Sequence, residues 1–392
     1  MKRIIAITFL IAVTASVVNA QITLQNVLDS ISVNNLQIKA SLKNRDAEIV
    51  NAHTGLTPDN PQVEYGYFPG NNDLIGNKST LNVSQSFYFP TVYSFKKAGA
   101  KLQEGKSEEV HQVNKREVLV EAAFHYLELT YFDRFSAELK KRMDDSEEVK
   151  RLFEKRLLSG DANQIELNKV RMEASRWKNE YTLNLARKAE KVQILTAMNS
   201  GKPVAVENPA YPVWQPLPVD SILAQAVRND PVLKALNFDQ QMAGNKVKLQ
   251  QALWLPQFKA GYGQETILDG SYRGVQAGIS IPLWQNKNAV KSARSQQQAT
   301  EGMLEAYAQQ LKSTVSAKYQ LVSSLRDNME ENKKLVESVQ NQELLRKSML
   351  SGNISVLEYY RELAYWYEAN DRYLVSAKDY YLEMVYLQQF NW

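Results

Sequence analysis

The chain has 392 residues, with 47 Lys and Arg, 43 Asp and Glu, three histidines and no cysteine. The absence of cysteine excludes disulfides, thiolate metal sites, cysteine nucleophiles and a lipid-modified N-terminal cysteine. A formal net charge of +4 is too small to predict nucleic acid as a partner. The scattered histidines form no metal motif, and no phosphate loop or nucleophile elbow occurs, so we expect no catalysis, cofactor or metal.

Residues 1–20 have the features of a secretory signal peptide. Two basic residues precede a mostly apolar stretch that ends in the small-x-small sequence Val-Asn-Ala, and such a segment is removed on export. No later stretch reaches about 18 consecutive apolar residues, the length that predicts a transmembrane helix. We therefore predict an exported protein whose mature chain begins at Gln21.

The mature chain is predicted to contain two copies of one unit. Residues 60–67 (NPQVEYGY) resemble residues 255–262 (LPQFKAGY), and VNNLQIKA at 33–40 stands at the same offset from RNDPVLKA at 228–235. Similarity at a period near half the chain length indicates a duplication. We expect repeat 1 over 21–202, an extended proline-rich connector over 203–218, and repeat 2 over 219–392.

Each repeat is predicted to begin with a single helix of about thirty residues, over Leu24–Ala52 and Val219–Leu253. The expected apolar positions include Val27, Ile31 and Leu36 in the first helix and Ile222, Val227 and Leu233 in the second.

A β-hairpin is expected next, at about 61–90 and about 256–284. Within Ser79–Phe89 and Gly274–Ile281, apolar residues alternate with small or polar ones, so the two sets lie on opposite faces. This alternation fits membrane strands that face lipid on one side and a lumen on the other. It equally fits amphipathic hairpins packed on the helices of a soluble protein. Because a lipid-exposed sheet cannot keep an open edge, the membrane interpretation requires several chains.

Two proline-free blocks follow the hairpins and predict very long helices. Thr91–Leu158 and Gln285–Leu350 would each extend about 100 Å if continuous. Each block ends in Leu-Ser-Gly, so we expect hairpin tips near 159–163 and 351–355, each followed by a final helix. This length indicates a tube or rod. The apolar stripe of the first block is predicted to be Leu119, Ala122, Tyr126, Leu129, Phe132 or Phe135, Leu139 and Met143.

Taken together, these features resemble the TolC family of outer-membrane efflux proteins. The resemblance covers essentially the whole mature chain and is carried by the export signal, the twofold repeat, NDPVLKA, the PQ…GY strand starts and the Leu-Ser-Gly breaks. The compact length and helix-rich halves are similar to the heavy-metal (CzcC- and CusC-like) branch of that family. The resemblance implies an α+β membrane protein with a large periplasmic part, in the outer membrane of a Gram-negative bacterium.

For the assembly, the resemblance implies a homotrimer. Four strands from each chain would form a twelve-stranded transmembrane β-barrel in outer-membrane lipid, and the long helices would form an α-barrel through the periplasm. Such a channel is a passive duct in a tripartite efflux system. Its expected partners are a periplasmic adaptor (a membrane fusion protein) and an inner-membrane pump of the RND or ABC type.

The resemblance also assigns roles at the helix tips. It implies that the adaptor docks at Leu158, Ser159, Gly160, Leu350, Ser351 and Gly352. In TolC the periplasmic entrance is narrowed by acidic residues six and nine positions after the second glycine; the matching residues here are Glu358 and Arg361. Because Arg361 has the opposite charge, the acidic gate is not carried over whole. A local role for Glu358 is helix capping, since Ser355-x-x-Glu358, like Asn163-x-x-Glu166, matches a capping box.

Three alternatives remain at this point. The aromatic run at 358–374 could form a ligand cage, but its helical spacing predicts that Tyr360, Ala364 and Tyr367 pack against neighbouring helices. A soluble periplasmic coiled-coil adaptor or scaffold protein would share the signal and the helices, but not two alternating hairpins. A secreted helical enzyme would require a cluster of catalytic residues that this sequence lacks.

Overall fold

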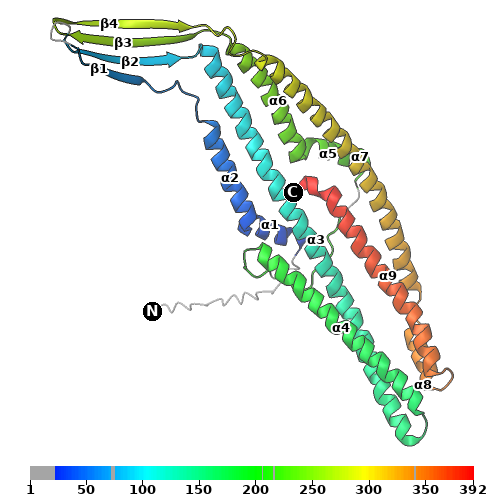
Figure 1. The fold of residues 1–392 in the computed structure, drawn as a ribbon. Helices are drawn as coiled ribbons and strands as arrows, with labels where there is room; N and C mark the ends of the chain where they lie inside the picture. Colours follow the sequence, from blue (N-terminus) through cyan, green and yellow to red (C-terminus); the bar gives the residue numbers. More distant parts are fainter. Residues whose placement is uncertain (1–22, 72–75, 205, 215–216, 340) are drawn as a thin grey trace, which may run out of the picture.

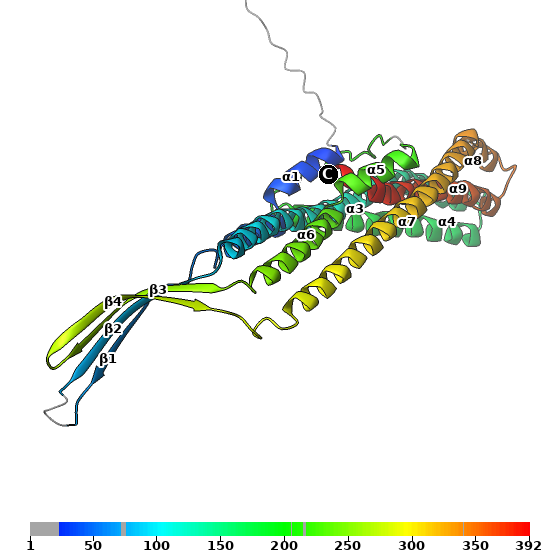
Figure 2. The same ribbon diagram turned by 90° about the horizontal axis from the view of Figure 1, so that it is seen from above.

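The computed structural model describes residues 23–71, 76–204, 206–214, 217–339 and 341–392. The proposed signal peptide, residues 1–20, lies outside these ranges. The chain forms a long helical rod with a four-stranded sheet projecting from one end and helix hairpins at the other (Figures 1 and 2). Both predicted β-hairpins are therefore found at the same end of the molecule, and both predicted tips at the opposite end.

The sheet joins the two hairpins into one antiparallel layer. Its order is β1-β2-β3-β4, with β1 at Gln62–Phe68, β2 at Lys78–Phe87, β3 at Gln257–Ile267 and β4 at Gly270–Ser280. The hairpins meet through β2 and β3, although these strands are far apart in sequence. Strands β1 and β4 each pair on one side only, so both edges of the described sheet are open.

In the half of the sheet next to the helices, the register separates an apolar face from a polar face, as predicted; beyond it, the same face carries Gln264 and Arg273. Val63, Val83, Tyr262 and Val275 stand in one cross-strand row. The adjacent row, on the opposite face, contains Glu64, Asn82, Gly263 and Gly274. The apolar row has no helix over it, and the Val275 side chain is 91% exposed. The sheet therefore does not pack on the helices, which removes the soluble-hairpin interpretation of these strands.

The helix that opens each half is broken, so the predicted single helices over Leu24–Ala52 and Val219–Leu253 are wrong. The observed elements are α1 at Leu24–Asn34 with α2 at Leu36–Ala52, and α5 at Val219–Asn229 with α6 at Pro231–Ala252.

Each break is made by a capping residue in extended backbone. Asn35 has φ −55° and ψ 130°, and its side chain accepts hydrogen bonds from the backbone N–H groups of Gln37 and Ile38. Asp230 has φ −63° and ψ 115° and accepts from the N–H of Leu233. Pro231 then occupies the first position of α6, where its missing N–H costs nothing. Two of the predicted apolar positions beside these breaks, Leu36 and Val227, are exposed.

The long helices of the two halves differ. Helix α3 runs without a break over Pro90–Ser159, which is 70 residues and about 100 Å, and is followed by α4 at Gln164–Met198. In the second half, α7 covers Ala289–Ser338 and a separate helix α8 covers Gln342–Leu350. The predicted continuous helix over Gln285–Leu350 is therefore wrong. Helix α9 at Val356–Gln388 and a short 3₁₀ helix, η1, at Gln389–Asn391 complete the chain.

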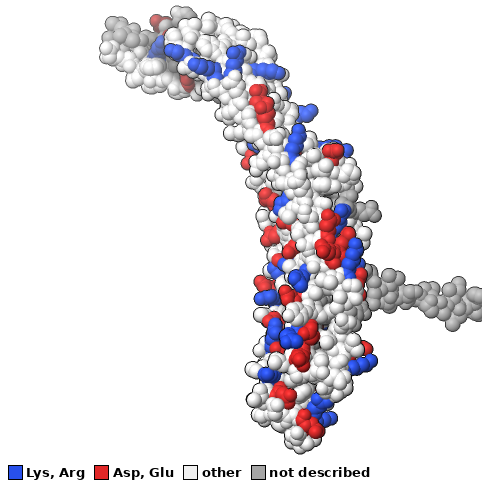
Figure 3. Space-filling view, turned by 90° about the vertical axis from the view of Figure 1, so that its right-hand side faces the viewer, with Lys and Arg blue, Asp and Glu red and all other residues white. Residues whose placement is uncertain are grey.

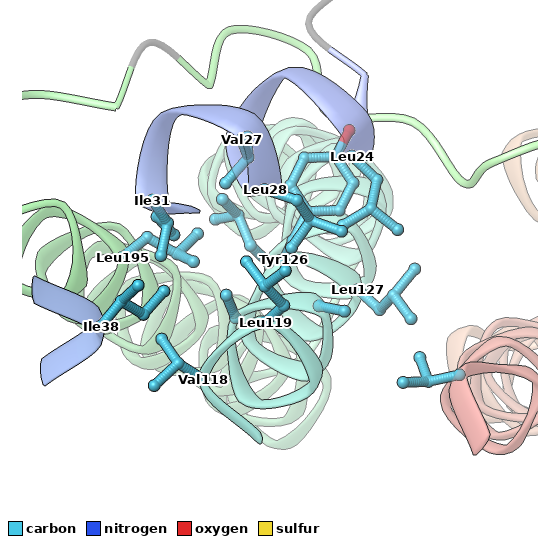
Figure 4. Packing of buried hydrophobic residues seen from close by; sticks show 14 residues of the cluster. Leu24, Val27, Leu28, Ile31, Ile38, Val118, Leu119, Tyr126, Leu127 and Leu195 are labelled. Carbon is cyan, nitrogen blue, oxygen red and sulfur yellow. The ribbon is translucent and has the colours of Figure 1, made fainter. Parts of the chain in front are cut away.

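Buried apolar residues lie along the rod in three clusters, because a rod this thin has no single globular core. One cluster holds α1 against the middle of α3 (Figure 4), and includes Val27, Ile31, Leu119, Tyr126 and Leu195. The second lies between the helices of the tip, and the third joins α5, α7 and α9. Of the predicted stripe on α3, five positions are buried, namely Leu119, Ala122, Tyr126, Leu129 and Leu139, while Phe132, Phe135 and Met143 are partly buried.

The aromatic run of α9 packs on its neighbours, but not through every predicted residue. Tyr367 is buried and Tyr360 is partly buried, as expected. Ala364 is exposed, so its predicted packing is wrong. The buried seam is Tyr359, Leu363 and Tyr367, which recur at four-residue spacing on one helix face.

No helix within the described residues is both long and apolar enough to span a membrane.

Candidate functional site: the tip of the rod

The first hairpin reverses at Gly160. This residue has φ +83°, a left-handed conformation that suits glycine, and the N–H of Asp161 donates to the carbonyl of Arg156 at 2.8 Å. Helix α4 then begins at Asn163, whose side chain accepts from the N–H of Glu166 at 2.9 Å. The Glu166 carboxylate accepts from the N–H of Asn163 at 3.0 Å. The predicted capping box is confirmed.

The second hairpin is closed in the same way. Gly352 has φ +76°, and the N–H of Asn353 donates to the carbonyl of Ser348 at 2.9 Å. Helix α9 begins at Ser355, whose hydroxyl accepts from the N–H of Glu358 at 3.2 Å. The Glu358 carboxylate accepts from the N–H of Ser355 at 2.9 Å. Both hairpins therefore combine a left-handed glycine with a capping box, and both end at one extremity of the rod (Figure 1).

The two hairpins are tied to each other. Arg156 Nη2 donates to the carbonyl oxygen of Leu350 at 2.8 Å, so a guanidinium at the end of α3 neutralises the carbonyl end of α8. Slightly above, Arg346 of α8 pairs with Glu148 and lies 3.9 Å from Asp145, both on α3. Because α3 and α8 belong to different halves of the chain, these contacts fix the relative position of the two tips.

All six proposed docking residues are exposed. The Leu158 side chain is 89% exposed and Leu350 is also exposed. A Cβ built at Gly160 or Gly352 would meet no atom within 4 Å. The two serines hold the turns: the Ser159 hydroxyl donates to the Asp161 carboxylate at 2.7 Å, and the Ser351 hydroxyl to the carbonyl of Lys347 at 2.6 Å. The tip thus offers exposed leucines on rigid turns, which is a surface that a partner protein can contact.

The proposed gate residues lie on the first turns of α9. The hydrogen bonds from the backbone and side chain of Ser355 lower the pKa of Glu358. Glu358 is therefore committed to the cap and charged at neutral pH. Arg361 lies one turn on and contacts the neighbouring Glu362, with 3.2 Å between Arg361 Nη2 and the carboxylate. The two residues are thus on one helix but have separate partners, and the capping role of Glu358 is confirmed.

One further interaction joins the halves above the tip and was not predicted. Arg142 of α3 is buried, and its two terminal nitrogens donate to both carboxylate oxygens of Asp371 on α9, at 3.0 and 2.5 Å. The guanidinium carbon lies 4.3 Å from the ring centroid of Tyr367 and 5.2 Å from that of Trp177. No local pattern could reveal this pair, because Arg142 stands in a run of charged residues and its partner is 229 positions away.

The described residues contain no group of three or more His, Asp or Glu side chains placed to hold a metal ion. The histidines have other contacts. His53 pairs with Glu104, and His125 lies near Glu121 and Glu128. His111 is buried and shares a hydrogen bond of 2.7 Å with Ser41. Burial lowers the pKa of His111, which keeps the imidazole neutral.

Comparisons with known proteins identify the fold. No protein-family model and no curated protein sequence matches the chain. Among solved structures, the chain is similar to a membrane protein from Pseudomonas aeruginosa, with a TM-score of 0.78, 15% identity, and coverage of 95% of this chain and 92% of that one. The chain is also similar to CusC, described by its transmembrane channel formation, with a TM-score of 0.75, 15% identity, and coverage of 94% of this chain and 91% of that one. For the outer-membrane protein VceC from Vibrio cholerae, the TM-score is 0.71 and the identity 12%, with coverage of 94% of this chain and 93% of that one.

The neighbours also include the CmeC outer-membrane channel of Campylobacter jejuni and the MtrE outer-membrane channel of Neisseria gonorrhoeae, at TM-scores of 0.67. These similarities extend over more than nine-tenths of the chain and bring the helical rod and the sheet into one known architecture. The predicted resemblance to the TolC family is thus confirmed at the level of the fold: the chain has the fold of the outer-membrane efflux channels.

Proposed function

We propose that this protein is the outer-membrane channel of a tripartite efflux system. In this proposal it acts as a homotrimer and as a passive duct, with no catalytic residues and no cofactor. The observation that carries the proposal is the sheet: four strands with an uncovered apolar face and two open edges, at the end of a rod about 100 Å long. Strands β3 and β4 have 11 residues each, which suits a membrane strand of about 9–11 residues.

The open edges support the trimer. In hydrocarbon each unpaired backbone group costs several kcal/mol, so β1 and β4 need partners, and a further chain can supply them. Three copies of a four-stranded sheet make a closed barrel of twelve strands. We propose in addition that the two halves of the chain are copies of one unit, that residues 1–20 are a cleaved signal peptide, and that the site is the outer membrane of a Gram-negative bacterium.

The tip supports a role in docking. We assign Leu158, Ser159, Gly160, Leu350, Ser351 and Gly352 to the contact with a periplasmic adaptor, which would connect the channel to an inner-membrane pump of the RND or ABC type. The exposed leucines and the rigid turns described above favour this assignment. Glu358 and Arg361 remain the candidates for the periplasmic entrance. The sheet disfavours a soluble adaptor protein, because such a protein would leave a large apolar face in water.

Fractionation and conductance test the main proposal. The mature protein is expected to require detergent for extraction from outer membranes and to form channels in planar bilayers. Release by osmotic shock without detergent, together with an absence of channels, would show that it is a soluble periplasmic protein.

The docking assignment has its own test. Replacing Gly352 with valine places a β-branched residue at positive φ, which strains the turn, and we expect lower adaptor crosslinking with trimer formation unchanged. The matched control is Gly302→Val: Gly302 lies within α7, has open space at its Cβ and is remote from the tip. Normal crosslinking and efflux in the Gly352 variant would contradict the assignment.

The gate assignment is tested by charge. Arg361 is exposed and its contact is with the adjacent Glu362, so Arg361→Ser removes one positive charge per chain with little effect on packing. If Arg361 lines the entrance, single-channel conductance or cation selectivity changes. Arg372→Ser, which removes an exposed arginine more than two turns further along α9, serves as the control. Identical traces for wild type and the Arg361 variant would remove this residue from the entrance.

A further inference from the structure

Three of the segments that join the helices to the sheet carry basic residues and no acidic ones, whereas the segment between α2 and β1 contains Asp59. No Asp or Glu occurs in residues 79–103, 240–264 or 270–300, which are the segments that lead into and out of β2, β3 and β4. Five basic residues in these segments form what we call the neck collar: Lys97 on α3, Lys248 on α6, Lys287 in the turn before α7, and Lys291 and Arg294 on α7.

The charges of the neck collar are uncompensated. All five residues are exposed, and none has a carboxylate within 4.0 Å among the described residues. Lower on the rod, by contrast, acidic residues are present and several basic residues are paired across helices, as in Lys188 with Asp133 at 2.5 Å and Lys318 with Glu383 at 2.6 Å. Figure 3 shows this change: basic atoms predominate next to the sheet, and basic and acidic atoms mix further down.

The collar occupies one side of the wall formed by α3, α6 and α7. The other side of this wall has a groove lined by Lys96, Lys246 and Gln296, among other residues. Successive helix positions are about 100° apart. Lys248 and Arg294 each lie two positions from a groove residue, about 200° around the helix, and therefore point away from the groove. Lys291, five positions before Gln296, points away as well.

The strands relate these two sides to the two faces of the sheet. Lys96 Nζ lies 5.2 Å from the ring centroid of Tyr88 on the groove side. Tyr88 directly follows Phe87, whose pairing with Phe258 places it in the apolar face, so Tyr88 projects toward the polar face. The groove therefore continues the polar face, and the neck collar continues the apolar face that meets lipid in the proposed barrel.

Aromatic residues mark the edge of that apolar face. Trp254 precedes β3 and Trp284 follows β4, and the Trp284 side chain is 76% exposed. Exposed tryptophans at strand ends are typical of the headgroup level of a bilayer. The four collar residues on helices lie within about 10 Å of the helix ends nearest the sheet, and the Debye length at physiological salt is about 8 Å.

We propose that the neck collar binds the headgroups of anionic phospholipids in the leaflet that faces the helical rod. This inference rests on the proposed function, because it requires the sheet to be in the membrane. Clusters of Lys and Arg next to a membrane-embedded segment attract anionic lipids. A trimer would present three copies of the collar around the base of its barrel, and would be surrounded there by an annulus enriched in these lipids.

The test compares annular lipid with bulk lipid. Wild-type trimers are inserted into vesicles of phosphatidylethanolamine with a minority of phosphatidylglycerol, excised with a small patch of bilayer by a styrene–maleic acid copolymer, and their lipids are quantified. We expect phosphatidylglycerol to be enriched about twofold over the bulk. The collar variant, with all five residues replaced by glutamine, should show the bulk ratio. High salt should also remove the enrichment in the wild type.

A matched control carries five substitutions to glutamine at exposed basic residues of the rod that have no ion pair within the described residues, namely Lys155, Lys178, Arg187, Lys312 and Lys334. This control should keep the wild-type enrichment. Equal enrichment in wild type and the collar variant, or none in wild type, would overturn the inference while leaving the channel intact. A wild-type protein that does not enter the vesicles would overturn both the channel and the collar.

Discussion

The two halves of the chain reach the tip by different helices. In the first half α3 is continuous for 70 residues, whereas the corresponding stretch of the second half is divided between α7 and α8. The difference follows from packing. Buried residues occur along α3 as far as Phe153, six residues before its end, but the last buried residue of α7 is Val322, and the remaining 16 residues of that helix are not buried.

This comparison shows what keeps a very long helix intact. An isolated helix is only marginally stable in water, and most helical stability in proteins comes from packing. Helix α3 is accompanied to the tip by α4 and then by α9, so its core continues. The lower end of α7 has only partly buried contacts, such as Leu325 and Met329, and a local hydrogen bond competes there, since the Ser338 hydroxyl donates to the carbonyl of Leu335. The second hairpin is thus held at the tip mainly by its contacts with the first.

The largest expected effect comes from removing the ion pair between the buried Arg142 and Asp371, whose side chain is 37% exposed. Asp371→Ala leaves the Arg142 guanidinium buried without its carboxylate, and we expect a loss of about 3 kcal/mol in stability, which a lower melting temperature of the detergent-solubilised trimer would report. The double variant Arg142→Met, Asp371→Leu should be much closer to wild type, because no charge is left unpaired. Equal losses in the single and double variants would show that packing, and not the ion pair, joins α3 to α9.

The helix caps should separate the halves at the next level. Asn163→Ala and Ser355→Ala each remove one capping side chain, at a cost of about 1 kcal/mol. The lost protection should be confined to the first turn of α4, which is supported by α3. In Ser355→Ala the lost protection should extend further into α9, because the neighbouring helix α8 is only nine residues long and supports α9 less than α3 supports α4. Amide hydrogen exchange read by mass spectrometry measures both. The same extent of deprotection in both variants would contradict the difference between the hairpins.

A smaller effect is expected at the break itself. Ser338→Ala with Asn341→Ala places the best helix former at two positions flanking the break, for a gain of roughly 0.5–1 kcal/mol in helix formation. Slower amide exchange at the end of α7 would follow. The control is the pair Ser313→Ala and Ser324→Ala, in the continuous part of α7, which should leave exchange at the break unchanged. If the flanking substitutions also leave it unchanged, missing helix propensity is not part of the cause, and missing packing alone explains the break.

The elements predicted from the sequence are those that leave local marks. Pro90, Gly160 and Gly352 signal helix starts and ends through their own backbone preferences, and strand alternation is visible within ten residues. The break at Asp230 also leaves a local mark, because Asp-Pro is a helix-start pattern.

The remaining features depend on residues distant in sequence. Neither the break after Ser338 nor the Arg142–Asp371 pair could be predicted from the sequence, since the first reflects contacts that α7 lacks and the second joins different halves. At the tip, the turns and both capping boxes followed from short motifs. The contacts that Arg156 and Arg346 make could not be predicted from short motifs, because their partners, Leu350 and Glu148, belong to the other hairpin.

The smallest effect concerns the pH dependence of the tip. A hydrogen bond from Arg346 lowers the pKa of Glu148 below its ordinary 4.5, so this pair stabilises the contact of α8 with α3 above that pH and loses its contribution as the pH falls through the lowered pKa. Burial raises the pKa of Asp145 beside it, so Asp145 is protonated first on acidification. We expect the distance between the two tips to increase only below the ordinary glutamate pKa, after Asp145 is already neutral. Because the chain has no cysteine, the double variant Lys155→Cys, Leu344→Cys can carry one spin label on each exposed side of the tip, and pulsed electron spin resonance on trimers with a minority of labelled chains measures that distance. Glu148→Gln should show the wider distance already at neutral pH, whereas Asp145→Asn should keep the wild-type profile. A pH response that is lost in Asp145→Asn but kept in Glu148→Gln would instead assign the tie to Asp145, whose side chain is 53% exposed.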